Sequence, residues 1–260
     1  MRANRNSGAA MGPLAGAILT SRALRAIPMP MAKSLKLVIF DVDGTLIDSQ
    51  RIICAAMQKA FGAHALKCPP QEKLLSIVGL SLPDAFARLG EGEAGFPVAT
   101  LIESYKDAFF GFREAGLHLE PVFPGAREAL EALSRRPDIL LGIATGKSQR
   151  GARAVLERIG MLDRFHTIKT ADDAPSKPHP GMVIDAMREA GTDARDTVVV
   201  GDSIYDMEMA RAAGAKAVGV SWGYHTPDAL TQTGAHIVIS GFAELIPALD
   251  AIWSGVSADA

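Results

Sequence analysis

Two acids separated by a single residue follow an apolar stretch near the beginning of the chain. Residues 37–39 are Leu-Val-Ile, typical of a strand buried on both faces, and Asp41 and Asp43 come where that strand should end. Because side chains alternate along a strand, both acids are expected on one side, while Gly44 lets the backbone turn away. Two converging carboxylates repel each other, so this spacing indicates a bound cation or a shared proton.

Three later segments supply groups that complement this pair. They are Ala144-Thr145-Gly146-Lys147, Ser176-Lys177-Pro178 and Gly201-Asp202-Ser203-Ile204-Tyr205-Asp206. By itself, Asp-Val-Asp-Gly would suit a solvated turn, since acids and glycine dominate turns. However, Asp41, Thr145 and Asp202 all fall where predicted strands end, and open parallel sheets bind ligands beyond the carboxyl ends of their strands. The joint pattern therefore favours a functional site over a turn.

The elements that would hold these groups alternate between strands and helices in the second half of the chain. Apolar runs predict strands at 139–144, 165–168, 197–200, 215–220 and 237–239. Helices are expected between them, at 125–136, 149–159, 180–190 and 205–213, and a last helix ends near 253. Repeated strand–helix units with apolar strands predict an α/β protein, a Rossmann-like core with a doubly wound parallel sheet.

The segment between the first acids and this core shows helical periodicity. Apolar residues recur at helical spacing in 50–62, 72–78, 82–89 and 98–115, and no convincing strand is predicted between 49 and 120. The predicted domain organisation is an α/β core formed by 34–48 and 122–255, with a smaller all-helical cap, 49–121, inserted after the first strand. Hinges are expected near 48–50 and 122–125.

The composition is that of a soluble globular protein, with 48% hydrophobic and 22% charged residues in a chain of 260. A formal net charge of −2 gives no reason to expect a nucleic-acid or acidic-membrane partner. No stretch approaches the roughly 18 apolar residues of a membrane span. Cys54 and Cys68 lack the spacing of a zinc site or a redox motif, so we expect reduced thiols in a cytoplasmic protein.

Residues 1–33 differ in composition from the rest of the chain. They contain many small residues and the basic residues Arg2, Arg5, Arg22 and Arg25, and no acid precedes the paired acids described above. Such a segment could be a transit-type leader or a weak secretory signal around 14–20. The apolar run is short and broken by Gly16, so we expect a disordered N-terminal extension, upstream of a start at Met29 or Met31.

In combination and in their order, the four motifs resemble those of the haloacid dehalogenase-like hydrolase superfamily, and the similarity extends over most of 36–253. The helical insertion resembles the C1-type cap of that family, and the chain looks closest to phosphoglycolate phosphatases. The resemblance implies a Mg²⁺-dependent phosphatase that hydrolyses a small phosphorylated metabolite, phosphoglycolate-like or a sugar phosphate, through an aspartyl-phosphate. We expect a monomer or homodimer without a nucleic-acid or membrane partner.

The resemblance also implies roles for the acids. Asp41 would be the nucleophile that attacks phosphorus, and it would bind the metal as well. Asp43 would protonate the leaving oxygen, then act as a base toward water, and offer its backbone carbonyl to the metal. Dehalogenases of the superfamily lack this second acid and need no metal. Asp202 would bind Mg²⁺ directly and Asp206 would hold a metal-bound water or Lys177, although both acids also suit the first turn of a helix.

Further positions match groups that bind phosphate in this family. The Thr145 hydroxyl would hold a phosphoryl oxygen, with backbone N–H groups near Gly146 helping, although threonine also suits a turn or a helix N-cap. Lys177 would neutralise Asp41 and the phosphoryl oxygens, whereas an isolated lysine usually lies at the surface. Ser148 is a separate candidate for the N-cap of the next helix.

Substrate contacts beyond the phosphoryl group are expected from the cap, whose closure could exclude water from the first chemical step. Residues 78–81, Val-Gly-Leu-Ser, resemble the family's specificity loop, which makes Gly79 and Ser81 candidate substrate-binding residues. Further candidates, each also suited to the surface, are Arg51, His64, Lys67 and Lys73. Residues 222–224, Trp-Gly-Tyr, resemble a loop at the rim of the site, where a packing role fits equally well. His179 is expected to be an ordinary loop residue.

Two other functions share these motifs. A sugar-phosphate mutase similar to β-phosphoglucomutase would keep the same core, metal and paired acids but return the phosphoryl group to a sugar. Its cap pattern is not evident in this sequence. A non-catalytic binding protein on the same fold would have lost turnover, although every charged position of the motifs is intact. We therefore rank hydrolysis of a phosphate ester first.

Overall fold

The computed structural model describes residues 34–117 and 120–255, so the predicted disordered extension, 1–33, lies outside the described residues. In chain order the elements are β1 (Lys36–Phe40), α1 (Gln50–Ala63), α2 (Gln71–Leu75), α3 (Leu82–Leu89), α4 (Val98–Glu114), α5 (Ala126–Ser134), β2 (Ile139–Thr145), α6 (Gln149–Arg158), η1 (Leu162–Arg164), β3 (Thr167–Thr170), α7 (Gly181–Ala190), η2 (Ala194–Asp196), β4 (Thr197–Gly201), α8 (Ile204–Ala212), β5 (Lys216–Val220), α9 (Pro227–Thr233), β6 (Ile237–Ile239), η3 (Phe242–Glu244) and α10 (Leu245–Ser254). The label η marks a short 3₁₀ helix.

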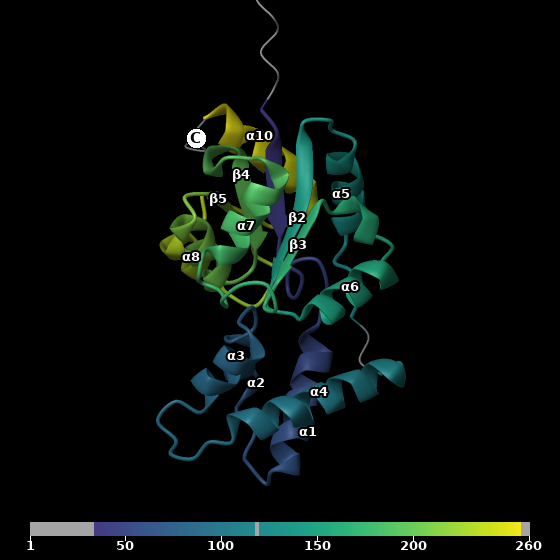
Figure 1. Cartoon of the computed structure of the whole chain (residues 1–260), viewed down its shortest axis with the longest axis vertical. Helices are drawn as coiled ribbons and strands as arrows, with labels where there is room; N and C mark the ends of the chain where they lie inside the picture. Colours follow the sequence, from purple (N-terminus) through teal and green to yellow (C-terminus); the bar gives the residue numbers. More distant parts are fainter. Residues whose placement is uncertain (1–33, 118–119, 256–260) are drawn as a thin grey trace, which may run out of the picture. The chain divides into compact units, whose positions relative to one another are not determined.

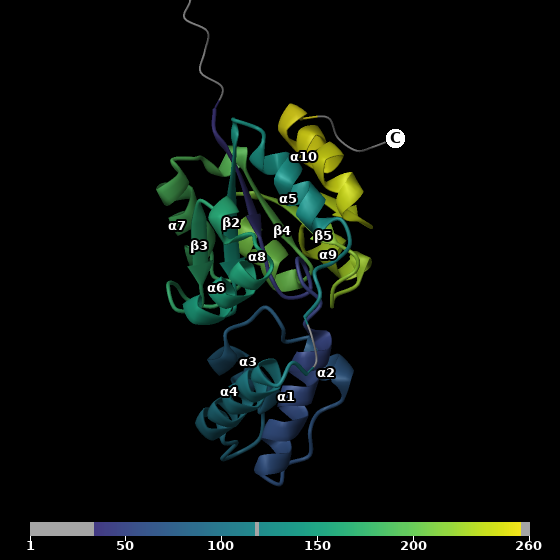
Figure 2. The same cartoon turned by 90° about the vertical axis from the view of Figure 1, so that its right-hand side faces the viewer.

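The six strands of the described residues form one parallel sheet in the order β3-β2-β1-β4-β5-β6 (Figure 1). Helices α5, α6 and α10 pack on one face of the sheet, and α7, α8 and α9 pack on the other (Figure 2). The chain runs outward from β1 to β3 and then returns to add β4, β5 and β6 on the other side of β1. The predicted α/β fold with a doubly wound parallel sheet is confirmed.

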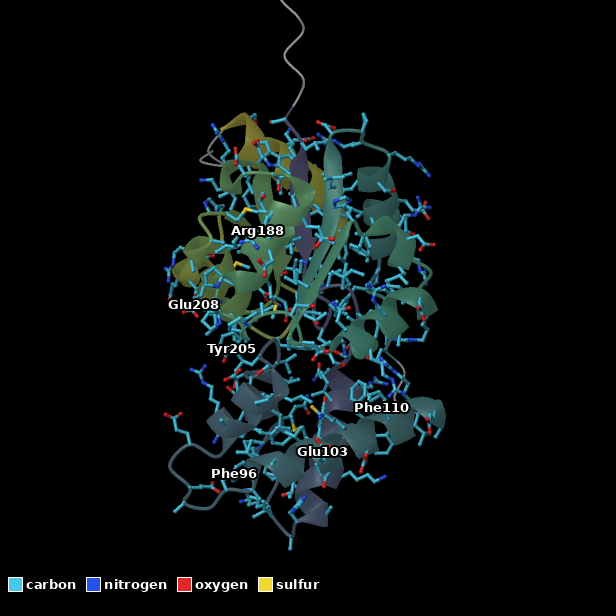
Figure 3. The ribbon with its side chains drawn as sticks, in the orientation of Figure 1. Phe96, Glu103, Phe110, Arg188, Tyr205 and Glu208 are labelled. Carbon is cyan, nitrogen blue, oxygen red and sulfur yellow. The ribbon has the colours of Figure 1, made fainter. Side chains whose placement is uncertain are left out.

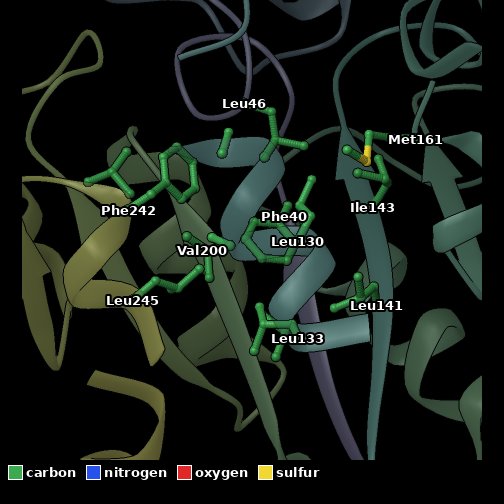
Figure 4. Packing of buried hydrophobic residues seen from close by; sticks show 14 of the residues in the cluster. Phe40, Leu46, Leu130, Leu133, Leu141, Ile143, Met161, Val200, Phe242 and Leu245 are labelled. Carbon is green, nitrogen blue, oxygen red and sulfur yellow. The ribbon is translucent and has the colours of Figure 1, made fainter. Parts of the chain in front are cut away.

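The alternation of side chains along β1 explains its uninterrupted apolar sequence. Val38 and Phe40 pack into the cluster under α5, α6 and α10, part of which Figure 4 shows around Phe40. Leu37 and Ile39 point to the opposite face, where they pack with α7, α8 and α9. All of these side chains are fully buried. Because neither face of the central strand meets solvent, polar residues cannot alternate with apolar ones until the strand ends.

Helices α1 to α4 follow β1 in the sequence and form a hydrophobic cluster of their own. Helices α1 and α4 pack against each other, and a chain of aromatic rings connects them through α3. The ring centroids of Phe61 and Phe86 are 6.3 Å apart, those of Phe86 and Tyr105 are 5.9 Å apart, and those of Tyr105 and Phe109 are 5.8 Å apart. The division into a core, 34–48 and 122–255, and a cap, 49–121, stays a prediction.

Tyr205 of α8 belongs to the same cluster as these insertion helices. Its hydroxyl donates to the carbonyl oxygen of Ser76 at 2.9 Å and accepts from Arg88 Nη1 at 3.3 Å. Figure 3 labels Tyr205 on the ribbon of α8. The sheet-bearing part of the chain therefore contributes aromatic side chains, Tyr205 and the partly buried Tyr224, to the packing of the helical insertion.

Three local predictions need correction. The strand expected at 165–168 is β3, Thr167–Thr170, because the 3₁₀ turn η1 comes first and Phe165 packs into the core before pairing begins. The helix expected at 72–78 ends at Leu75, after which the Ser76 hydroxyl donates to the Lys73 carbonyl. Helix α9 was not predicted, although Thr226 caps it and Pro227 occupies its first turn.

Candidate active site

The carboxyl ends of three neighbouring strands bring the predicted motifs together. In the strand order, β1 lies between β2 and β4. Asp41 directly follows β1, Asp202 directly follows β4, and Thr145 is the last residue of β2. The Asp41 N–H donates to the carbonyl of Val200 at 3.0 Å, which extends the pairing of β1 and β4 up to the acid itself. Residues far apart in the sequence therefore meet at one edge of the sheet, as a doubly wound topology requires.

A buried cluster of acids forms around one lysine at this edge. One carboxylate oxygen from each of Asp41, Asp202 and Asp206 lies within 4.8 Å of the others, and all three residues are buried. The Lys177 ammonium lies 3.0 Å from Asp41 Oδ1 and 2.6 Å from Asp206 Oδ1, and its side chain is completely buried. Three carboxylates with one ammonium carry two net negative charges when all are ionised. A divalent cation would balance that charge.

The acidities of these groups reflect the same excess of negative charge. Burial raises the pKa of Asp41 to about 7; Lys177 opposes the rise, while Asp206 and Asp43 add to it. Burial also raises the pKa of Asp202 well above its usual range, with further contributions from Asp206 and Asp41. Burial by itself would lower the pKa of Lys177, but Asp206 and Asp41 raise it overall. The cluster is therefore short of positive charge.

The donor set fits a hard divalent metal ion. Asp41 Oδ2 is buried and accepts no hydrogen bond from the residues that the structure describes, so a buried carboxylate oxygen is left without a partner. The oxygens of Asp202 and Asp206 already accept hydrogen bonds, but each carboxylate oxygen has a second lone pair for a metal. Carboxylates are the ligands that hard cations prefer. Asp41, Asp202 and Asp206 could therefore hold a metal ion between them.

Asp202 is held in a fixed orientation from both sides. Its Oδ1 accepts from the Thr45 hydroxyl at 2.9 Å, and its Oδ2 accepts from the Tyr224 N–H at 2.9 Å. Gly44 has φ +79°, and a Cβ there would collide with the Asp202 carboxylate. Glycine is thus needed at position 44 both for the backbone conformation and for the close approach of the two motifs.

The two interpretations of Asp206 from the sequence both hold. Its Oδ2 accepts from the Ser203 N–H at 3.1 Å, and the Ser203 hydroxyl accepts from the Asp206 N–H at 3.3 Å, so the two residues form a capping box at the start of α8. Its Oδ1 lies against Lys177, so one carboxylate both starts the helix and fixes the lysine. The N-cap prediction for Ser148 is confirmed too, because its side chain accepts from the Gly151 N–H.

Asp43 has a partner that the sequence reasoning did not identify. The Lys147 ammonium lies 2.9 Å from Asp43 Oδ1 and 3.8 Å from Glu120 Oε1. Thr145 is buried, and its hydroxyl accepts from the Lys147 N–H at 3.3 Å. Lys147 was visible in the second motif as the residue after Gly146, but its partner is more than a hundred positions away. Only the pairing of β1 with β2 makes that contact evident.

Glu120 is a further residue near the site that the sequence did not indicate. It is a buried acid whose Oε2 accepts from Arg113 Nη2 at 2.7 Å and from Arg158 Nη2 at 3.2 Å. Arg113 lies on α4 and Arg158 on α6, so Glu120 joins the insertion to the sheet-bearing part of the chain. Through Lys147 the same network reaches Asp43.

A cavity of about 160 Å³ opens beside the acid cluster. Its wall includes Asp41, Asp43, Thr145, Gly146 and Lys147 from the strand ends, and apolar residues of α1, α3 and α4. All of the sequence-predicted catalytic residues except Lys177 thus border one cavity. Lys177 is not part of the wall as far as the described residues show, but it contacts the Asp41 carboxylate.

The predicted specificity loop, 78–81, reaches the second motif. Gly79 borders the cavity, and a Cβ on Gly146 would collide with the carbonyl oxygens of Leu80 and Gly79. The Ser81 N–H donates to the Ser176 hydroxyl at 2.7 Å. The Ser81 hydroxyl donates to Asp84 Oδ2 at 2.5 Å and accepts from the Asp84 N–H, as the N-cap of α3. Ser81 therefore joins the loop to the third motif, and its contact with substrate stays a prediction.

The remaining candidates from the insertion and the rim loop lie elsewhere. None of Arg51, His64, Lys67 and Lys73 is part of the wall of the cavity, as far as the described residues show. In the rim loop, the Trp222 indole N–H donates to the Thr45 carbonyl at 3.1 Å, and Tyr224 Oη lies 3.0 Å from Ser49 Oγ. This loop therefore forms hydrogen bonds with the first motif and with the residues just after it.

A family model described as haloacid dehalogenase-like hydrolase matches residues 38–220, more than half of the chain. The chain belongs to the haloacid dehalogenase-like hydrolase family. It is 36% identical over 223 residues to the "Probable phosphatase IndB" of Dickeya dadantii, covering 83% of this chain and 94% of that protein. It is 32% identical over 218 residues to a phosphoglycolate phosphatase of Agrobacterium fabrum, covering 82% and 91%.

A solved structure supports the same assignment. The chain is similar to a hydrolase from Pseudomonas syringae with a TM-score of 0.74 and 28% identity, covering 84% of this chain and 99% of that one. The predictions of a haloacid dehalogenase-like fold and of a phosphatase enzyme in this family are confirmed. Within the part of the chain that the structure describes, no helix is long and apolar enough to cross a membrane.

Proposed function

We propose that this hydrolase is a Mg²⁺-dependent phosphatase that releases inorganic phosphate from the monoester of a small metabolite through an aspartyl-phosphate on Asp41. The observation that supports it best is the buried cluster in which Lys177 contacts both Asp41 and Asp206, beside Asp202. A carboxylate is a weak nucleophile toward a negatively charged phosphoryl group, so it needs cations fixed beside it. The relatives named as phosphatases support the same reaction class.

The metal would be held by Asp41, Asp202 and Asp206, with the backbone carbonyl of Asp43 as a further ligand. Magnesium prefers oxygen ligands and retains several waters, which suits a site made of carboxylates. When bound, it would offset the repulsion between the nucleophile and the phosphoryl group. Lys177 supplies a permanent positive charge at the same carboxylate.

In the first step, a carboxylate oxygen of Asp41 attacks phosphorus, and the bond between phosphorus and the leaving oxygen breaks. Asp43 donates a proton to that oxygen, so the product leaves as a neutral alcohol. Asp43 is two residues from the nucleophile, and both residues border the cavity. The Thr145 hydroxyl and the N–H groups that follow it would hold the phosphoryl oxygens.

In the second step, water attacks phosphorus of the aspartyl-phosphate and gives its proton to Asp43. The bond between phosphorus and the Asp41 oxygen breaks, which regenerates the Asp41 carboxylate and releases inorganic phosphate. Lys147, 2.9 Å from Asp43 Oδ1, holds this acid at the cavity wall during both steps. Lys147 is therefore proposed as a positioning residue.

The proposal is tested by measuring phosphate release and by trapping the intermediate. The protein is incubated with Mg²⁺ and a panel of monoesters that includes 2-phosphoglycolate, a sugar 1-phosphate and p-nitrophenyl phosphate. Phosphate release that EDTA stops is expected. Acid quenching during turnover should leave a phosphoryl group on the peptide containing Asp41, and hydroxylamine should remove it, as it does from acyl phosphates.

Two results would contradict the proposal. No phosphate release from any ester of the panel would favour a non-catalytic protein on the same fold. Conversion of the sugar 1-phosphate into an isomer without phosphate release would identify a mutase. A label on a residue other than Asp41 would overturn the assignment of the nucleophile while leaving the reaction class intact.

A further inference from the structure

The cavity wall formed by the insertion is mostly apolar, with Lys106 and Arg113 of α4 as its charged members. The side chains of Ile53 and Met57 from α1, Leu82 from the start of α3, and Tyr105 and Phe109 from α4 border the space in front of Asp41. Ile53, Met57, Tyr105 and Phe109 are buried within the hydrophobic cluster of the insertion. The part of a substrate beyond its phosphoryl group would therefore lie against carbon atoms and aromatic rings.

The cations at the cavity wall already have partners. Among the described residues, Lys106, Arg113 and Lys147 border the cavity together with the nucleophile. Lys106 lies 3.0 Å from Glu103, Arg113 lies 2.7 Å from Glu120, and Lys147 lies 2.9 Å from Asp43. To pair with Arg113 or Lys147, a carboxylate on the substrate would have to compete with the largely buried acids Glu120 and Asp43, and without a cation it would lie beside apolar side chains; both are costly. Only the exposed Lys106–Glu103 pair would open at little cost.

The face of Phe109 holds two of these cations in place. Arg113 Cζ and Lys147 Nζ each lie 5.3 Å from the centre of its ring. Each cation thus has an acid and a ring as neighbours, which reduces its freedom to turn toward a ligand. Phe109 consequently contributes to the apolar wall and also fixes the charges at its border.

We propose that the leaving group of the substrate is an uncharged, largely apolar alcohol that carries a single ring, and that a leaving group with a carboxylate is disfavoured. This inference rests on the proposed phosphatase function and names the class of ester that it acts on. An apolar cavity of about 150 Å³ in another protein accommodates one benzene ring. The cavity in this protein is of similar size and must also hold the phosphoryl group beside Asp41, so it leaves room for no more than one ring.

The test compares three esters that all release a primary alcohol. Benzyl phosphate has an aromatic ring, cyclohexylmethyl phosphate has a saturated ring, and 2-phosphoglycolate has a carboxylate. With Mg²⁺ present, kcat/KM should be at least roughly 10-fold higher for benzyl phosphate than for 2-phosphoglycolate. The cyclohexylmethyl ester should lie between them if the aromatic faces matter, and should equal benzyl phosphate if apolarity alone decides; both outcomes support the proposal.

Variants of the insertion wall give a second readout. Leu82→Lys places a cation at the cavity from a position that is only partly buried, so it should raise kcat/KM for 2-phosphoglycolate and lower it for benzyl phosphate. Ile184→Lys is the matched control, because Ile184 is an exposed apolar residue on α7 that is not part of the cavity wall. The control should leave the ratio of the two constants unchanged.

The outcomes separate this inference from the proposed function. Hydrolysis of all three esters with equal kcat/KM, or with a preference for 2-phosphoglycolate, overturns the inference about the leaving group but leaves the phosphatase intact. An unchanged ratio in Leu82→Lys, despite native-like circular dichroism, also overturns it. No hydrolysis of any ester, p-nitrophenyl phosphate included, overturns the proposed function and this inference together.

Discussion

The two walls of the cavity differ in chemistry. At the strand ends, buried carboxylates, a lysine and a threonine are fixed by hydrogen bonds and ion pairs, and their neighbours are polar. On the insertion side, aliphatic side chains and aromatic rings form most of the wall, together with Lys106 and Arg113. Under the proposed function, the strand ends would bind charge and transfer the phosphoryl group, whereas the insertion would mainly contribute apolar contact. We therefore expect one wall to decide the reaction and the other to decide which ester enters.

The walls also differ in what holds them. The polar wall stands on parallel strands whose side chains are buried on both faces, so each acid has little freedom. The apolar wall consists of helices that meet the polar wall in the loop 78–81, where the carbonyls of Gly79 and Leu80 lie close to Gly146. Substitutions in the polar wall should therefore change kcat, and substitutions at the junction should change KM.

The largest effect is expected for Asp41→Asn. An amide cannot attack phosphorus, so kcat should fall by roughly 10⁴-fold or more while circular dichroism stays native-like. Asp228→Asn changes an exposed acid in the first turn of α9 and should keep kcat within a factor of two or so. Activity near the native level in Asp41→Asn would show that the chemistry of the polar wall has been assigned to the wrong residue.

Lys177→Met should have the next largest effect. It removes the cation beside Asp41 and Asp206, and loss of one group that stabilises developing charge lowers kcat by about 10²–10³-fold. Lys169→Met serves as the control, because Lys169 pairs with Glu189 on the periphery. Equal losses in both variants would mean that the effect comes from general stability, which a thermal melt would reveal.

Gly146→Ala should act at the junction of the walls. A Cβ at this position would collide with the backbone oxygens of Leu80 and Gly79, so the loop must shift. KM should rise by roughly 10-fold, because small displacements of binding groups weaken substrate positioning. Gly62→Ala is the control, since a Cβ there meets no atom within 4 Å in α1. An unchanged KM in Gly146→Ala would mean that the junction does not affect binding.

The smallest effect is on the free energy of unfolding, and it tests the carboxylates of the polar wall without an activity assay. In the metal-free protein the pKa of Asp41 is raised from its ordinary value near 4 to about 7. Between those values the folded state binds more protons than the unfolded state, so the free energy of unfolding decreases as the pH rises. A dication that binds the ionised carboxylates should therefore stabilise the protein more at pH 8 than at pH 5.5.

At a Mg²⁺ concentration about 100-fold above its Kd, linkage contributes about 2.7 kcal/mol, or an increase in Tm of roughly 5–10 °C at pH 8. The increase should shrink at pH 5.5, and it should be lost at both values in Asp202→Asn. Differential scanning fluorimetry measures it. An equal Mg²⁺ effect at both pH values would argue against a site built from the raised carboxylates.

Local pattern was sufficient for much of the fold because the apolar runs were unambiguous. Val198 to Val200 could only be buried, and Gly201 and Asp202 ended that strand where the sequence indicated. Helix α9 was missed because it spans only Pro227–Thr233, which is too short for periodicity to be decisive. The predicted strand at 165–168 began two residues before β3, because the apolar Phe165 was taken as part of the strand. Phe165 instead packs into the core ahead of it.

Some residues of the candidate site could be predicted from the sequence, and others could not. Asp41, Lys177 and Asp202 could be named from their motifs, and in the structure Lys177 contacts Asp41, while a carboxylate oxygen of Asp202 lies within 4.8 Å of one of Asp41. The pairing of Lys147 with Asp43 and the Glu120 network could not be named, because opposite charges in a sequence give no distance. The capping of α3 by the Ser81 hydroxyl was likewise not predicted, and the contact of Ser81 with substrate stays a prediction.

What the sequence determined by itself was the set of strand-ending acids and the helical character of 49–121, since both depend on residue type and on spacing over a few positions. The tertiary structure alone decided the strand order, and with it the neighbourhood of β1, β2 and β4 that assembles the acid cluster. It also decided that α1, α3 and α4 present an apolar wall to that cluster. These are long-range contacts, and their free energy comes from burial between segments that the chain keeps far apart until it folds.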